Sequence, residues 1–560
     1  LALNMWDGAG SANINDGKVS GGSGTWRAGG PSTNWTGVDG KLNASWQQGG
    51  FAIFAGAPGT VTVDNTGPGG AVRMGGAQFA VSGYTVNGSA LAIDAPATVV
   101  RVGDGTAAST GMSATIAAAI GGAGGLVKDD GGTLVLSGKN SYTGGTTVKA
   151  GVLRISSDAN LGAAAGDLAL DGGTLAIAAG SGPLGTARDI ALGTGGGTLD
   201  LANNAYEVDG VLSGKGALTV TGKGGTLLLS KANSFAGGTS LRGGASITAF
   251  AAGALGSGDV RQVDSDTSLV FSTGGGAGSN NYIVGTAGVS GNNTLAFAQN
   301  ATAAAAKIAL FGAGWQDPDR NSLQFLDGAV GANATINNKG AAVVFAAKSS
   351  AGSATITNGA NSLLSFIGAS SAAKAAIDNQ GGMLQFAGTA TGTTSTVVKS
   401  TGTVDVSGST AKTGVELGSL SGSGAVVLGA TRLTVGGFGG NDTLSGVVSD
   451  KGSVFAQPGS GTGGSIVKVG AGTLTLSGVN TYTGGTTVAA GTLSVTNKSG
   501  SATGTGAVQV QSGATLAGTG TIAGTVTVAN GGAVNPGNGA GTLTVGGLAL
   551  NAGSVLNYQL

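Results

Sequence analysis

The sequence lacks cysteine and histidine altogether, and charged side chains are scarce. Of 560 residues none is Cys or His, 9% are charged and 4% are aromatic. The absence of Cys excludes disulfide bonds, thiolate metal sites and a Cys nucleophile. The absence of His removes the commonest general base and the commonest metal ligand. The 26 basic and 26 acidic residues balance and form no basic run, so neither nucleic acid nor a membrane surface is expected as a partner.

Glycine and small apolar residues make up much of the chain instead. Gly accounts for 115 residues, about a fifth of the sequence, against roughly 7% in average proteins. The apolar fraction of 41% is too high for the usual disordered chain. Gly follows no collagen period, and only 8 residues are Pro. We therefore expect many short strands separated by tight turns.

A long near-copy is the clearest internal repeat. Residues 132–153 and 472–493 are identical at 17 of 22 positions, and a degenerate third copy begins at Gly225. Each copy alternates β-prone strands of three to five residues with Gly corners, where a positive φ carries no Cβ penalty. The third copy has Phe235 where the other two have Tyr142 and Tyr482. Identical units far apart in a chain fit a stack of coils better than separate hairpins.

A second repeat has a much shorter period, of roughly 20 residues. Its three series are Phe325, Phe345, Phe366 and Phe386; Ile336, Ile356, Ile377 and Val397; and Asn338, Asn358 and Asn379, ended by Lys399. Coils stacked about 4.8 Å apart place like residues above one another. The sequence therefore predicts an all-β fold, a parallel β-helix with roughly 20–22 residues per coil.

No catalytic, cofactor-binding or metal-binding residue is assigned. The acid pairs Asp129–Asp130, Asp264 with Asp266, and Asp317 with Asp319 lie among turn residues, for which turn chemistry is the preferred interpretation. Residues 437–446 approach a Ca²⁺-binding nonapeptide. Phe438 replaces its second Gly and there is one copy, so Asn441 and Asp442 are interpreted as turn residues, with Ca²⁺ as the alternative.

The N-terminal tryptophans are interpreted as packing in early coils, with a ligand platform as the alternative. Residues 251–320 are the least regular part of the chain, and residues 314–320 are expected to protrude as a loop.

The near-copy resembles the passenger-associated transport repeat of bacterial autotransporters. Flanking segments follow the order usual in that family, from GSLSGSG at residues 418–424 to GGAVNPGNG at residues 531–539. The resemblance implies a right-handed β-helix and a type V secreted passenger, at the surface of a Gram-negative bacterium, associated with its outer membrane or secreted. It also implies a C-terminal outer-membrane β-barrel as partner, which this chain does not contain.

The function expected from this resemblance is that of a structural stalk or adhesin, a virulence-type protein that is not an enzyme. It would bind a host-cell, matrix or glycan receptor, or associate with itself. Two alternatives remain open: a stalk for an enzymatic domain in missing sequence, and a β-helix polysaccharide lyase.

One continuous solenoid with five soft divisions is expected. These are Trp-containing coils at 1–110, coils with the first transport-type repeats at 111–250, Ala/Phe ladder coils at 251–411, coils with the second clear repeat at 412–496, and C-terminal passenger coils at 497–560. Leu1–Trp6 is no signal peptide, and the last residues read as mid-strand. We expect sequence to be missing at both ends.

Overall fold

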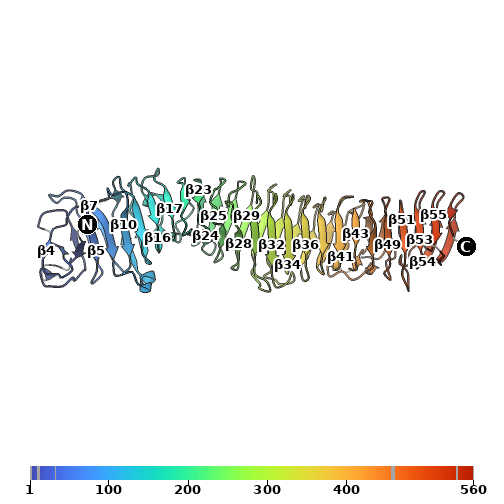
Figure 1. Cartoon of the computed structure of the whole chain (residues 1–560). Coiled ribbons are helices and arrows are strands. Elements are labelled where there is room, and N and C mark those ends of the chain that lie inside the picture. Colours follow the sequence, from blue (N-terminus) through green and yellow to red (C-terminus); the bar gives the residue numbers. More distant parts are fainter. Residues whose placement is uncertain are drawn as a thin grey trace. The chain divides into compact units, whose positions relative to one another are not determined.

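The computed structural model describes residues 3–8, 10, 13–31, 33–455, 461–537 and 540–558. Asn538 and Gly539 of the GGAVNPGNG segment, and Leu1, Ala2, Gln559 and Leu560 at the chain ends, lie outside the described residues. The chain divides into two compact units, Leu1–Ser268 and Leu269–Leu560. The described residues form a parallel β-solenoid with essentially no helix and about 23 turns, which confirms the predicted fold class. Figure 1 shows the successive coils.

The coils of the first unit stack mainly through two parallel sheets. One consists of β1 (Leu3–Trp6), β5 (Gly50–Phe54), β7 (Val72–Phe79), β10 (Thr98–Val102), β13 (Leu126–Asp129), β15 (Thr146–Val148), β17 (Leu168–Leu170), β20 (Ile190–Leu192) and β23 (Leu212–Gly214). The other consists of β2 (Gly24–Trp26), β6 (Thr60–Val63), β8 (Thr85–Gly88), β11 (Ser113–Ile116), β14 (Thr133–Leu136), β16 (Val152–Ile155), β18 (Thr174–Ile177), β21 (Gly197–Asp200), β24 (Leu218–Thr221), β26 (Thr239–Leu241) and β28 (Val260–Gln262).

A third parallel sheet begins in this unit with β19 (Leu184–Thr186), β22 (Ala205–Val208), β25 (Thr226–Leu229) and β27 (Ser246–Ala249). The other elements are β9 (Leu91–Ala92), β12 (Ile120–Gly121) and the 3₁₀ segments η2 (Ala107–Gly111) and η3 (Asp158–Leu161). Near the N-terminus, β3 (Trp35–Thr36) pairs antiparallel with both β1 and β4 (Asn43–Ala44). This stretch therefore departs from the parallel coils predicted there.

The coils of the second unit have three sides. The first carries β30 (Asn281–Val284), β32 (Lys307–Phe311), β34 (Thr335–Lys339), β36 (Thr355–Asn358), β38 (Ala376–Asn379), β40 (Val397–Ser400) and β43 (Ser419–Ser421), and then β46 (Asp442–Leu444), β49 (Thr473–Leu476), β51 (Thr492–Val495), β53 (Thr515–Gly518), β55 (Ala533–Pro536) and β57 (Val555–Leu556). The second carries β31 (Thr294–Phe297), β33 (Ser322–Phe325), β35 (Ala342–Phe345), β37 (Leu363–Phe366), β39 (Met383–Gly388), β41 (Thr403–Ser409), β44 (Val426–Val427) and β47 (Val448–Ser449).

The third side begins as single bridges, such as that between Val330 and Ser350, and widens into a sheet. Its strands are β42 (Val415–Leu417), β45 (Arg432–Val435), β48 (Ser465–Lys468), β50 (Thr486–Val488), β52 (Val508–Val510), β54 (Thr521–Val528) and β56 (Thr544–Leu550). The remaining strand, β29 (Ser268–Phe271), lies at the boundary between the units.

A stack of buried phenylalanines forms the core of the first coils of the second unit. Phe325, Phe345, Phe366 and Phe386 are fully buried, and neighbouring rings lie 4.4–5.0 Å apart, as predicted. The stack also includes two rings that the sequence period misses, Phe271 and Phe297, which are also fully buried. Offset stacking of aromatic rings adds about 0.5–1.5 kcal/mol per pair to the burial of their area.

The isoleucine and asparagine series end differently from the prediction. Ile377 pairs with Val398, whereas Val397 pairs with Ala376, because this coil is longer by a single position than the series assumes. For the same reason Asn379 pairs with Ser400 and not with Lys399. The asparagine ladder therefore ends in a hydrogen bond from the Asn379 Nδ2 to the Ser400 Oγ, at 3.0 Å.

Candidate functional site

The three repeat copies share one backbone design. Each begins with a strand that pairs with the third strand of the same copy, and the second strand pairs with the fourth. The strands involved are β13–β16, β24–β27 and β48–β51. Each copy therefore spans two stacked coils.

An asparagine joins coils in every copy, buried in two of them (Asn140 and Asn480) and half-buried in the third (Asn233). The Oδ1 of Asn140 accepts a hydrogen bond from the Ile120 N–H of the preceding coil, and its Nδ2 donates to the Asn160 carbonyl of the following coil. Asn480 makes the same two bonds with Val448 and Ala502. In the third copy, Asn233 makes them with Leu212 and Ala254, at 2.8 and 2.6 Å. One amide thus satisfies two main-chain groups, one from each neighbouring coil, at a corner where no strand pairing satisfies them.

Two copies also bury a tyrosine–threonine pair. The hydroxyls of Tyr142 and Thr146 lie 2.6 Å apart, and those of Tyr482 and Thr486 lie 2.5 Å apart. Burial raises the pKa of Tyr142 to about 12, while its bond to Thr146 opposes the shift. In the third copy, Phe235 has no hydroxyl, and the buried Thr239 Oγ1 has no hydrogen-bond partner among the described residues. The degenerate copy therefore keeps the fold and loses one polar contact.

A buried lysine lies in the first strand of two copies. The Nζ of Lys128 donates to the carbonyl oxygens of Asp129, Asp130 and Ala150 at 2.7–2.9 Å. Lys468 makes the same three bonds to the equivalent residues of its own copy, at 2.8–3.1 Å. Burial lowers the pKa of Lys128 to about 8, against the opposing charges of Asp129 and Asp130. Burial also lowers the pKa of Lys468, with Asp442 opposing.

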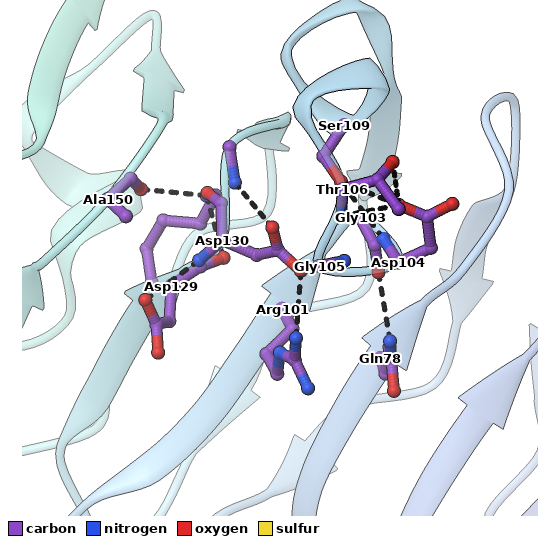
Figure 2. A network of polar contacts seen from close by, with 12 residues as sticks. Gln78, Arg101, Gly103, Asp104, Gly105, Thr106, Ser109, Asp129, Asp130 and Ala150 are labelled. Carbon is purple, nitrogen blue, oxygen red and sulfur yellow. Dashed lines mark hydrogen bonds and ion pairs between the residues drawn. The ribbon is translucent and has the colours of Figure 1, made fainter.

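The Asp129–Asp130 pair belongs to a polar network on one edge of the first unit (Figure 2). Asp130 adopts φ 68°, and its counterpart in the other copy, Gly470, adopts φ 72°, so the two residues form the same corner. The Asp130 carboxylate accepts bonds from the Arg101 guanidinium at 3.0 Å and from the Gly105 N–H at 3.2 Å. These contacts hold the loop that leads into η2 against the coil below (Figure 2).

The same loop is closed by Asp104. Its Oδ1 accepts hydrogen bonds from the Thr106 N–H and hydroxyl and from the Ser109 hydroxyl, at 2.7–3.0 Å (Figure 2). The Thr106 bonds, and then the Ser109 bond, lower the pKa of Asp104. All of these contacts organise a turn, and the carboxylates of the network are occupied by donors from the chain itself.

The other predicted acid pairs are also engaged in turns. The Asp264 carboxylate accepts from the Gly243 N–H at 3.2 Å, and Asp266 occupies a positive-φ position. Asp317 accepts from the Ser290 hydroxyl and from the Asp319 N–H, and both bonds lower its pKa. No group of three or more Asp, Glu, His or Cys residues suited to a metal ion occurs among the residues that the structure describes.

The two candidate Ca²⁺ ligands, Asn441 and Asp442, bond to different parts of the chain. The Asn441 Oδ1 accepts from the Thr473 N–H at 2.8 Å. The interpretation of Asp442 as a turn residue is wrong, because Asp442 is the first residue of β46. Its buried carboxylate accepts a hydrogen bond from the Ser419 hydroxyl at 2.6 Å.

Four tryptophans close the N-terminal part of the core. Trp6, Trp26, Trp35 and Trp46 are 0–3% exposed, and their rings lie 4.6–5.1 Å from one another in the contacting pairs. Phe54 packs on three of them. Because a ligand platform needs accessible rings, packing is the interpretation that the structure supports.

The segment expected to protrude at residues 314–320 lies partly against neighbouring coils. The Trp315 N–H donates to the Asn361 carbonyl at 2.9 Å, and its ring lies 5.4 Å from that of Phe455. Phe455 belongs to the long connection between β47 and β48. Sequence reasoning did not single out this connection.

A polar cavity of about 310 Å³ lies beside this connection. It is lined by Ser407, Ser409, Thr410, Ala411, Lys412, Gly414, Ala430, Thr431, Arg432 and Gly461. The turn after β41 and the turn before β45 form most of its wall, so two successive coils build it. In the sequence these are ordinary Ser/Thr/Gly turns, and only their stacking brings the side chains together.

Comparisons with known proteins agree with this architecture. The family described as Passenger-associated-transport-repeat matches residues 126–155, 218–245 and 466–495, which are the three copies described above. The Adhesin BmaC autotransporter of Brucella suis biovar 1 (strain 1330) is 43% identical over 263 residues, which is 46% of this chain but 7% of that protein. The chain thus spans a small part of the length of this relative. No solved structure matches.

The repeat coils define a passenger-type parallel β-solenoid. Together with the similarity to the Brucella protein, they support an autotransporter passenger domain. Among the described residues, no helix is both long and apolar enough to span a membrane.

Proposed function

We propose that this chain is a surface-exposed passenger segment that mediates attachment, at the surface of a Gram-negative bacterium or after release from it. The observation that carries the proposal is the 43% identity over 263 residues to a protein named as an adhesin autotransporter. In the full-length protein, a C-terminal outer-membrane barrel would be the partner that exports and holds the passenger. The alternative of a stalk for a separate enzymatic domain has no observation in its favour in this chain.

The physical basis of the proposal is a stiff scaffold that presents turns. Ladders of stacked Phe, Ile and Asn side chains fill the coils, and the interior of such a stack is closely packed. The turns between strands, by contrast, tolerate variation without disturbing the core. A binding surface built from successive turns is therefore held in a fixed geometry by the coils beneath it.

The chain itself is proposed to carry no active site. The acids singled out from the sequence accept hydrogen bonds from the chain's own turns, as Asp130 and Asp317 do. A β-helix polysaccharide lyase would instead direct its acids toward a substrate groove. The purified chain, incubated with a polyuronide, should release no unsaturated product, as monitored by ultraviolet absorbance.

The test of attachment is a gain-of-function display experiment. The chain is fused to a heterologous outer-membrane anchor in a non-adherent strain, and bacteria bound to host-cell monolayers and to matrix-coated wells are counted. The anchor alone is the control. Adherence above this control, competed by native but not by heat-unfolded soluble chain, is expected. Surface display without any gain in adherence to cells, matrix or other bacteria would contradict the proposal.

A further inference from the structure

The cavity beside the long β47–β48 connection combines positive charge with hydroxyl groups. Lys412 and Arg432 are exposed, and neither has a carboxylate partner among the described ion pairs. Ser407, Ser409, Thr410 and Thr431 supply hydroxyls around them. In a chain with only 9% charged residues, two unpaired cations in the wall of one cavity form an unusual concentration of charge.

The guanidinium of Arg432 is already held in place. Its Nε and Nη2 both donate to the Thr413 carbonyl, at 3.0 and 2.7 Å. These two bonds fix the plane of the guanidinium over the turn that contains Thr413. Its Nη1 donates to no described residue. A guanidinium fixed in this way loses less side-chain entropy when it binds an anion, and its planar donors suit carboxylate and sulfate groups.

Thr431 adds a further hydroxyl to the same place. Its residue is 7% exposed and lines the cavity. This hydroxyl is therefore a candidate contact for a ligand hydroxyl or carbonyl.

Asp405, which lies two residues before Ser407 of the cavity wall, is already satisfied. Asp405 is 1% exposed, and its carboxylate accepts bonds from the Ser407 N–H and hydroxyl, at 2.9 and 2.6 Å, and from the Ser453 hydroxyl. These donors turn it away from solvent and leave the Ser407 oxygen free to accept. The accessible charge of the cavity is thus that of Lys412 and Arg432.

We propose that this cavity binds an acidic glycan, a sugar that carries a carboxylate or a sulfate group. The anionic group pairs with Arg432 and Lys412, and sugar hydroxyls bond to Ser409, Thr410 and Thr431. A volume of about 310 Å³ is at the lower end of the range for small-ligand sites, which suits one or two sugar rings. The inference deepens the proposed attachment function, on which it rests, by naming the class of receptor.

The test measures binding of defined sugars to the purified chain. Sialyllactose and a sulfated heparin-derived disaccharide are the acidic probes, and lactose is the neutral one. Saturable binding of at least one acidic probe at physiological salt, observed by calorimetry or ligand-detected NMR, is expected. Arg432→Gln and Lys412→Gln should each weaken it by about ten-fold or more, since each removes a charge-assisted contact.

The matched control is Lys348→Gln. Lys348 is exposed on the turn after β35, on the same corner of the solenoid, and lines no part of the cavity. Equal loss of binding in this variant would mean non-specific charge attraction and would overturn the inference, as would no binding of either acidic probe. Thr431→Val tests the buried hydroxyl, and it should weaken the same probe without unfolding the coil.

The two proposals fail in different ways. Acidic-glycan binding by the purified chain without adherence of displaying bacteria would refute attachment and leave the cavity assignment standing. Adherence that is unchanged by Arg432→Gln and Lys412→Gln would support attachment but would place its binding surface elsewhere. This result would contradict the proposal that the cavity binds the receptor.

Discussion

Replacing Phe235 by Tyr should stabilise the degenerate repeat copy. The buried Thr239 hydroxyl has no partner among the described residues, whereas the equivalent threonines bond a tyrosine hydroxyl at 2.5–2.6 Å. A hydrogen bond within a protein contributes about 0.5–1.5 kcal/mol net, and relief of an unsatisfied buried group adds to this value. We therefore expect Phe235→Tyr to raise local stability by about 1 kcal/mol.

The reverse substitutions supply the matched controls. Tyr482→Phe leaves the Thr486 hydroxyl without its partner and should cost about 1–3 kcal/mol. Tyr142→Phe should cost less, because the Thr146 hydroxyl also donates to the Leu161 carbonyl at 3.1 Å. The free-energy cost of each Tyr→Phe substitution thus depends on the number of partners that its threonine retains.

Hydrogen exchange of the strand that carries Thr239 is the appropriate assay. Solenoid stability is approximately a sum of neighbouring-coil terms, so a global melting temperature would dilute a local effect. A gain of about 1 kcal/mol slows exchange in β26 roughly five-fold where exchange follows local opening. Faster or unchanged exchange in Phe235→Tyr would refute the reasoning, since it would mean that the hydroxyl does not reach Thr239.

Three further perturbations test the ladders and corners. Phe366→Ala removes one ring from the stack and should cost about 3–5 kcal/mol, seen as new proteolytic cleavage between residues 345 and 386; unchanged resistance would argue against the ladder. The folded-state pKa of Lys128, about 8, is below its ordinary 10.5, so urea stability should rise as pH increases through this window. Lys128→Met should abolish that rise, and an equal rise in the variant would assign it to other groups. Gly470→Asp should destabilise its corner, because a Cβ there lies 2.1 Å from the Gly436 carbonyl, whereas Asp130→Gly fits the corner and should lose only the bonds of the carboxylate to Arg101 and Gly105, so its cost in urea stability should be smaller. Similar losses in the two variants would contradict this account of the corner.

The ladders were predictable because their period is visible in the sequence. Coils of nearly constant length place Phe325 to Phe386 in phase, and the structure stacks them as predicted. Phe271 and Phe297 were missed because the coils below them are longer, as the wider spacings from Phe271 to Phe297 and from Phe297 to Phe325 show. Extra residues enter the turns, so they change the period without changing the stack.

The cavity could not be predicted in the same way. Ser407 and Thr431 lie on different coils, and each belongs to a turn that resembles many others in this chain. Their proximity arises from the stacking of one coil on the next and from the long connection beside them. Composition is also uninformative there, because serine and threonine are ordinary turn residues.

The buried polar groups give the stack its register. Phe or Ile ladders alone would tolerate a coil being skipped during folding, because a ring would still meet a ring. The amides of Asn140 and Asn480 and the ammonium of Lys128 instead need main-chain partners from particular neighbouring coils. A skipped coil would leave these groups buried and unsatisfied, at a cost of about 1–3 kcal/mol for each neutral group and more for the charged one. The repeat copies therefore act as register marks in a core whose hydrophobic ladders are largely interchangeable.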